Sequence, residues 1–213
     1  MKKLVGVGVV VILALALVVS AYADEVSEEE ILEEIDYARE AYEDGSYSEA
    51  IEGFNFVIAQ IRSLQVNELR KALPEPLSGW TMEEQESDAM GYGLFGLGSG
   101  AGVTRRYYEE DSGTTIEITI GAQSIMLQQI TMFLKNPALA ATQPNTKLEK
   151  KRVAGKRITI VEEFSSEDES GKLSLTPDDK TLVIVEGWDI SDKEILYEYL
   201  DGIDFDLISE ILG

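Results

Sequence analysis

The hydrophobic period of this chain changes at residues 73–80. Before this segment, apolar residues recur every three or four positions, which is the period of an amphipathic helix. After it, apolar and polar residues alternate in short β-branched and aromatic runs, which is typical of strands. Pro74 and Pro76 end the preceding helix because they fix an extended conformation. We therefore expect a helical part, residues 24–72, followed by an α+β domain, residues 73–213.

Capping boxes predict two helices in the first part. Ser27 with Glu30 opens one helix and Ser46 with Glu49 opens the next, since each pair satisfies open backbone groups at a helix start. Gly45 permits the turn between them. The apolar residues that this pattern places on the two helix faces are Ile31, Ile35, Ala38, Tyr42, Ala50, Phe54, Val57, Ile58, Ile61 and Leu64. The prediction is a helical hairpin of about 40 residues.

The hairpin resembles a single tetratricopeptide (TPR) repeat. The matching residues are Ala38, Ala41, Tyr42, Gly45, Tyr47, Ala50, Phe54 and Val57. Glu34 stands where the family has an aromatic residue, and the usual terminal proline is missing. One repeat cannot bury its own apolar face. We therefore expect a TPR-like hairpin docked on the following domain rather than a peptide-binding array.

The second part reads as strands and two helices. Strands are predicted at residues 103–110, 114–121, 147–153, 157–164, 172–175 and 181–188, and a helix at residues 124–135 that ends before Pro137. A third capping box, Ser191 with Glu194, predicts a C-terminal helix. In the second strand isoleucines alternate with Thr115, Glu117 and Thr119, which predicts one buried and one solvated face. The expected fold is α+β, an antiparallel sheet covered on one face by two helices.

This second part resembles a family of exported bacterial domains of uncharacterised function with a PsbP-like fold, that of the photosystem II extrinsic proteins. The resemblance rests on Leu73-Pro74, Gly79-Trp80, Arg106-Tyr107, Asn136-Pro137 and residues 153–156 and 185–187. It implies a PsbP-like α+β sandwich. These motifs are structural, so the resemblance implies a fold and no activity.

The N-terminus has the layout of a secretory signal peptide. Lys2 and Lys3 precede an apolar run at residues 4–19, and Ala21 and Ala23 are the small residues of a cleavage site. We therefore predict a signal peptide at residues 1–23 and a periplasmic or other extracytoplasmic protein that is soluble after cleavage. No second hydrophobic span follows in the sequence. The alternative is an uncleaved membrane anchor, because the run is almost long enough to cross a bilayer.

Charge and composition exclude several classes of function. The chain has 18 Lys and Arg against 40 Asp and Glu, and loss of Lys2 and Lys3 with the signal peptide changes the net charge from −22 to −24. Such a charge disfavours nucleic acid as a partner. The absence of Cys and His excludes cysteine nucleophiles, Ser-His-Asp triads, disulfides, and zinc, haem or iron–sulfur sites that need those ligands. We predict no cofactor, no metal site and no catalytic residue.

A glycine-rich run at residues 90–102 is the first candidate site. It precedes a strand and lacks the spacing and the Gly-Lys-Ser/Thr ending of phosphate-binding loops, which argues against a nucleotide site. Its apolar side chains, Tyr92, Leu94, Phe95 and Leu97, are a candidate contact surface for a partner or a membrane. The alternative is a connecting loop without further function.

A basic patch is the second candidate site. Its members are Lys147, Lys150, Lys151, Arg152, Lys156 and Arg157. Three interpretations are open: a solvated hairpin, contact with the chain's own acidic helix at residues 28–34, or an anionic partner such as lipid headgroups or phosphorylated glycans.

These observations favour an exported, non-catalytic binding or assembly accessory protein whose partner is another exported protein or an envelope component. The alternative class is a hydrolase that uses Asp/Glu pairs on the open face of the sheet. A glycosidase also needs an aromatic-lined cleft, and Trp80 and Trp188 are interpreted as core anchors instead. Clusters of acidic residues are interpreted as solvated faces rather than calcium sites. The oligomeric state is left open.

Overall fold

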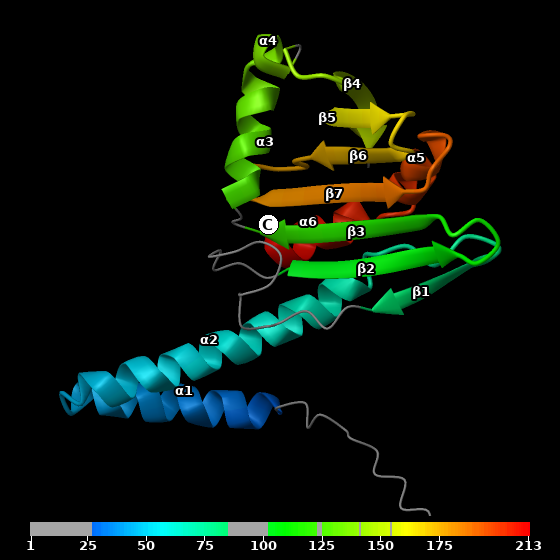
Figure 1. Ribbon diagram of the computed structural model, residues 1–213. Coiled ribbons are helices and arrows are strands. Elements are labelled where there is room, and N and C mark those ends of the chain that lie inside the picture. Colours follow the sequence, from blue (N-terminus) through cyan, green and yellow to red (C-terminus); the bar gives the residue numbers. More distant parts are fainter. Residues whose placement is uncertain (1–26, 85–101, 123–124, 141, 154) are drawn as a thin grey trace, which may run out of the picture.

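The computed structural model describes residues 27–84, 102–122, 125–140, 142–153 and 155–213 (Figure 1). The described chain has three parts in space: a helical arm, a seven-stranded sheet, and short helices on the two faces of that sheet. The predicted signal peptide and the residues Tyr92, Leu94, Phe95 and Leu97 lie outside the described residues.

Two antiparallel helices form the arm, as predicted. The first, α1 (Glu28–Glu43), starts with the capping box of Ser27 and Glu30, in which each side chain bonds the other's backbone N–H. The chain turns at Gly45, whose φ of 80° favours glycine. The second, α2 (Tyr47–Arg70), begins after Ser46, but the Ser46 side chain makes no capping hydrogen bond, so the predicted second capping box is wrong.

Small residues set how closely the two helices approach. Ala38 and Ala41 of α1 and Ala50 and Gly53 of α2 are buried. A Cβ atom on Gly53 would lie 2.9 Å from the Cβ of Ala38, which leaves no room for a side chain there. The contact between the helices is therefore narrow, and much of the apolar surface of α2 lies beside it.

The sheet is antiparallel throughout, with strand order β1-β2-β3-β7-β6-β5-β4. The strands are β1 (Trp80–Glu84), β2 (Gly102–Glu109), β3 (Thr115–Ala122), β4 (Thr146–Val153), β5 (Lys156–Ser165), β6 (Ser170–Leu175) and β7 (Thr181–Trp188). Six of the seven were predicted; β1, at one edge, was not. The α+β class is confirmed.

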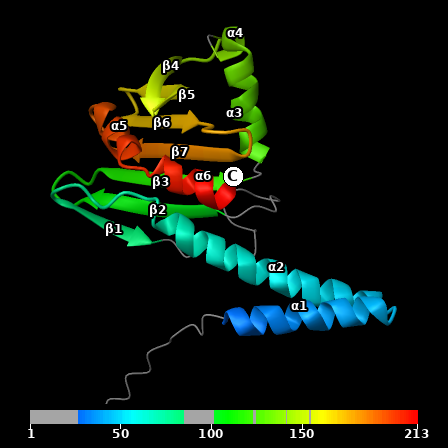
Figure 2. The ribbon, with the colours of Figure 1, turned by 180° about the vertical axis from the view of Figure 1, so that it is seen from behind.

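Helices cover both faces of the sheet, so the expectation of a single covered face is wrong. On one face lie α5 (Glu194–Asp201) and α6 (Phe205–Leu212), seen in front of the sheet in Figure 2. On the other face, α3 (Ile125–Lys135), which is followed by the short α4 (Pro137–Ala140), packs on Val161, Leu182 and Ile184. The third predicted capping box is also wrong, because α5 starts after Lys193 and the Glu194 N–H donates to the Asp192 side chain rather than to that of Ser191.

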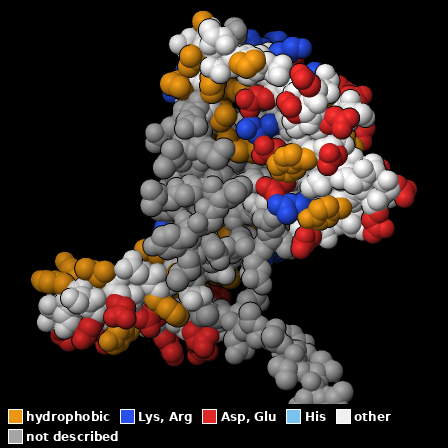
Figure 3. Space-filling model, in the orientation of Figure 1, with side chains coloured by type: hydrophobic (Ala, Val, Ile, Leu, Met, Phe, Trp, Pro, Cys, Tyr) orange, Lys and Arg blue, Asp and Glu red, His pale blue; other side chains and the backbone are white. Residues whose placement is uncertain are grey.

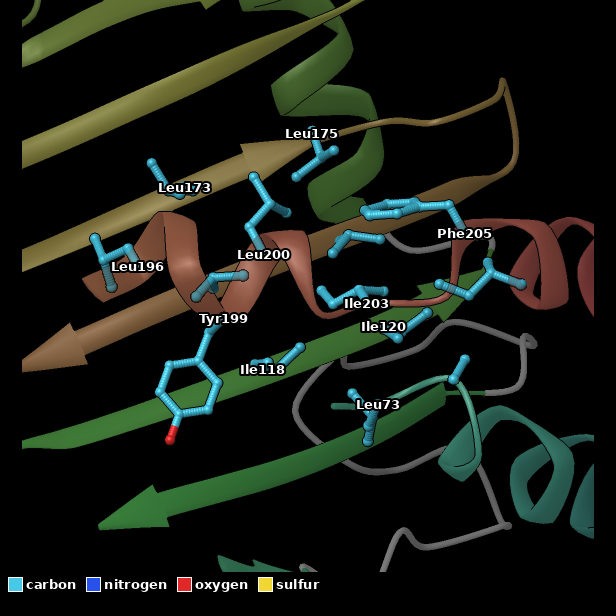
Figure 4. Packing of buried hydrophobic residues seen from close by; sticks show 14 of the residues in the cluster. Leu73, Ile118, Ile120, Leu173, Leu175, Leu196, Tyr199, Leu200, Ile203 and Phe205 are labelled. Carbon is cyan, nitrogen blue, oxygen red and sulfur yellow. The ribbon is translucent and has the colours of Figure 1, made fainter. Parts of the chain in front are cut away.

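The main core lies between the sheet and the pair α5 and α6. Figure 4 shows Ile118, Leu173, Leu196, Tyr199 and neighbouring apolar side chains converging from strands and helices. The Tyr199 ring packs against the rings of Tyr107 and Trp80, with centroids 4.5 and 5.4 Å away. Trp80 therefore packs against the core, as predicted.

The end of α2 belongs to this core. Val66 and Leu69 are buried in it, together with Leu73 of the following segment. From β2, the guanidinium of Arg105, a residue only 6% exposed, donates hydrogen bonds to the carbonyl oxygens of Arg70, Leu73 and Pro74. The helix end is thus held by a cation, which its dipole favours. Among the described residues, the arm docks on the domain through this end of α2, and the rest of the arm projects from it (Figure 1).

Candidate functional site

The basic patch lies on β4 and β5, at the edge of the sheet far from α1 (Figure 1). The register of the two strands divides it between two faces: Lys147, Lys151 and Lys156 share a face with Ile158, and Lys150, Arg152 and Arg157 share a face with Val161. The six cations therefore do not form one surface. Contact with the acidic helix within one chain is also wrong, because α1 lies at the other end of the molecule.

A charged network occupies the face that carries Lys151. The Glu162 side chain is 3% exposed and accepts hydrogen bonds from Lys193 Nζ, at 2.8 and 2.9 Å, and from the Tyr197 hydroxyl, at 2.7 Å. Lys151 Nζ lies 4.6 Å from the centre of the Tyr197 ring and 2.8 Å from an oxygen of Asp201. These residues tie β4 and β5 to α5.

The pKa values in this network follow from its contacts. Burial opposes ionisation of Glu162, but the hydrogen bonds from Lys193 and Tyr197 and the charge of Lys193 outweigh it and lower the Glu162 pKa. The hydrogen bond to Glu162 raises the Lys193 pKa. Burial is the main cause that raises the pKa of Tyr197, and its hydrogen bond to Glu162 adds to the rise. A shallow hollow of about 330 Å³ lies here, but its central carboxylate is already paired, so the network is structural.

A second group of charges crosses the other face of the sheet. Five charged residues stand opposite one another on neighbouring strands: Arg106 on β2, Glu117 on β3, Glu186 on β7, Lys172 on β6 and Glu163 on β5. Arg106 donates two hydrogen bonds to Glu117, at 2.5 and 3.0 Å, and Lys172 lies 3.4 Å from Glu163. The predicted solvated face of β3 is wrong, because Glu117 and Thr119 are buried. Figure 3 shows acidic and basic side chains interleaved on this face.

Glu186, in the middle of this row, has a raised pKa. Burial raises the Glu186 pKa; the nearby Lys172 opposes that rise, and the charges of Glu117 and Glu163 add to it. A hollow of about 480 Å³ lies beside it. The residues that line this hollow are Asn145, Glu163, Phe164, Ser165, Asp168, Ser170, Gly171, Lys172, Glu186, Gly187 and Trp188. Trp188 is 38% exposed here, so its interpretation as a core anchor is wrong.

The arm carries the most unusual surface among the described residues. Seven large apolar side chains on α2 are 40–63% exposed. Two of them are Phe56 and Leu64. The other five follow one line along the helix, and we call them the apolar stripe: Tyr47, Ile51, Phe54, Ile58 and Ile61. The sequence pattern predicted Phe54, Ile58, Ile61 and Leu64 on a packed face together with Ala50 and Val57, but of these only Ala50 and Val57 are buried. The other four are exposed, so this part of the prediction is wrong.

The stripe is long and follows one side of α2. Its members are spaced 4, 3, 4 and 3 residues apart, so they fall in one line along a helix. At one end it continues onto α1 through Tyr42, whose ring centre is 5.9 Å from that of Tyr47. In Figure 3, hydrophobic side chains gather along the edge of the arm formed by α2, and acidic side chains gather over α1. Large apolar groups left exposed together mark an interaction surface.

Comparison of the chain with protein families, with curated proteins and with solved structures found no match. The PsbP-like and TPR-like resemblances therefore stay predictions. Within the described residues, no helix is long and apolar enough to cross a membrane. No group of three or more Asp or Glu side chains that could hold a metal ion is found in that same part of the chain.

Proposed function

We propose that this protein is an exported, non-catalytic binding or assembly accessory protein whose helical arm pairs with a helix of its partner. The observation that carries the proposal is the apolar stripe on α2. The 4-3-4-3 spacing of the stripe is the a/d spacing of coiled-coil seams, in which one helix packs along another. Export rests on the predicted signal peptide at residues 1–23, and the expected partner is an exported protein or an envelope component.

The length and attachment of the arm support this function. The stripe spans residues 47–61, which is about 21 Å of helix at 1.5 Å per residue. The other end of α2 is buried in the domain core and held by Arg105. A partner helix on the stripe would therefore be held at a fixed place relative to the α+β domain.

Affinity capture with matched variants tests the proposal. The tagged chain, residues 24–213, is used as bait against envelope extract of the cells that make it, beside Ile58→Glu and Phe56→Glu. Ile58 lies in the stripe; Phe56, with a similar exposure, lies on another side of α2. We expect proteins retained by the unchanged chain and by Phe56→Glu to be lost with Ile58→Glu. Equal retention by all three baits contradicts the proposal.

The second candidate function is hydrolysis by acidic residues on the sheet face. It is favoured by Glu186, whose raised pKa suits a proton donor, at a hollow that also exposes Trp188. A panel of chromogenic glycosides tests it with the unchanged chain and with Glu186→Gln. Activity that is lost in Glu186→Gln supports hydrolysis, and absence of turnover with the unchanged chain rejects it for these substrates.

A further inference from the structure

We infer that the helix which covers the apolar stripe is α2 of a second copy of this chain, so that two arms pair to form a homodimer. This inference deepens the proposed function and rests on it, because it names the partner of the same surface. Three features of the stripe favour a second copy: its spacing, the charges beside it, and the area it can bury.

The spacing makes the stripe self-complementary. In heptad terms, Ile51 and Ile58 occupy a positions, and Tyr47, Phe54 and Ile61 occupy d positions. Knobs-into-holes packing needs the same 3.5-residue repeat on both helices. The α2 helix of a second copy carries that repeat over the same length. The two stripes can therefore pack against each other, and neither chain has to expose any further apolar surface.

The charges beside the stripe permit this pairing. Residues 28–62 contain 11 acidic and two basic residues, so two arms repel each other over most of their surface. The g positions Ala50 and Val57 are buried against α1. The open flank, at the e positions, carries Ser48, Asn55 and Arg62 and no acidic residue. The stripe is therefore the side of the arm on which two copies can approach with little repulsion.

The apolar area is sufficient for a dimer. Each large side chain of the stripe is 40–63% exposed. Aromatic side chains such as Tyr47 and Phe54 have roughly 150–250 Å² to bury and the three isoleucines have less, so two stripes together remove at most on the order of 1,000 Å² from water. That is about the lower limit for a specific interface. Tyr42, next to Tyr47, adds to the area at one end.

Sedimentation velocity of residues 24–213 tests the inference. We expect the mass of a dimer for the unchanged chain at micromolar concentration. Ile51→Glu combined with Ile58→Glu places four carboxylates in the interface between the two arms, and we expect the dissociation constant of the dimer to rise at least about 100-fold. Phe56→Glu is the matched control and should keep the dimer. Thermal unfolding followed by circular dichroism checks that the variants remain folded.

A cysteine reporter gives a second, independent measurement. The chain has no Cys, so Asn55→Cys introduces a single thiol beside the stripe, and Glu49→Cys introduces one on the other side of α2. If the two arms run antiparallel, the e position at residue 55 of one arm faces residue 55 of the other, so we expect Asn55→Cys, and not Glu49→Cys, to form a disulfide-linked dimer under mild oxidation. A chain that is monomeric up to about 100 µM with no Asn55→Cys dimer, or a dimer that both Glu substitutions leave unchanged, overturns the inference.

These outcomes are distinguishable from failure of the proposed function. If the chain is monomeric but still captures envelope proteins in a manner that depends on Ile58, the stripe binds another protein and only the second-copy inference fails. If the chain is monomeric and capture does not depend on Ile58, both fail.

Discussion

Glu162 allows a precise test of the electrostatics that join the sheet to α5. Its side chain is 3% exposed and accepts two hydrogen bonds from Lys193 and one from Tyr197. A hydrogen bond to a charged group contributes about 1.5–3 kcal/mol, and breaking a fully buried pair costs about 3–5 kcal/mol. Because the Lys193 side chain is 31% exposed and can regain water, we expect Glu162→Gln to lower the free energy of unfolding by about 2–3 kcal/mol at pH 7.

The pH dependence identifies the charge as the cause. The Glu162 pKa is lower in the folded chain than its ordinary value of 4.5, so its contribution to stability is present above that value and is lost as the pH falls through the folded pKa. The unchanged chain should therefore lose more stability than Glu162→Gln as the pH falls from about 5 to 3. The two curves should approach each other in acid.

Urea unfolding of the four proteins of a double-mutant cycle measures this effect. The cycle comprises the unchanged chain, Glu162→Gln, Lys193→Met and the double variant. At pH 7 we expect a coupling free energy of about 1–2 kcal/mol between the two side chains, which declines toward zero in acid. Effects that add to within about 0.5 kcal/mol at pH 7, or a coupling that is the same at pH 3, would refute the reasoning.

Three further predictions concern other parts of the chain. Because the pKa of Glu186 is raised in the folded chain, its protonated form stabilises the fold below the ordinary pKa, and this stabilisation is lost as the pH rises through the folded pKa. Glu186→Gln should therefore raise the midpoint of urea unfolding at pH 7 and leave it nearly unchanged near pH 4. A lower midpoint at pH 7 contradicts this prediction. Gly53→Val should lower the stability by about 1–3 kcal/mol because its side chain meets Ala38, and unchanged thermal unfolding would show that the helices separate without cost. Arg105→Met should lower the free energy of unfolding by about 2–4 kcal/mol, since three carbonyl oxygens lose a charged donor. Arg105→Lys should recover less than half of that loss, because an ammonium group does not reproduce the forked donor geometry of a guanidinium. Full recovery by lysine would argue against a role for that geometry.

Most of the strands could be predicted from the sequence because each carries its own alternation. β1 was missed because it has only two apolar residues, Trp80 and Met82, and ends in acids. It lies at the edge of the sheet, and within the described part of the chain β2 is its one neighbouring strand, so its conformation depends on that tertiary contact. The hydrophobic period of the sequence alone therefore does not predict such a strand.

The second covered face was missed for a different reason. The polar residues of β3 suggested water on one side, whereas Glu117 is buried by its ion pair with Arg106. The signal lay in β7, where residues 182–185 form a continuous apolar run, typical of a strand that is buried on both faces. Leu182 and Ile184 of that run face α3, and Val183 and Val185 face the main core.

The candidate site could be predicted only in part. The helical period shows which residues of α2 form an apolar face, but it does not show how much of that face α1 covers. The residues of α2 that were predicted to share one packed face span a wide arc, and α1 approaches so closely at Gly53 that it covers only one side of it. The uncovered side is the apolar stripe. Since α2 runs as one helix from Tyr47 into the core at Leu69, a partner that moves the stripe must move the domain or bend the helix. Binding at the arm is thus mechanically coupled to the orientation of the α+β domain, which is the property an assembly accessory protein needs.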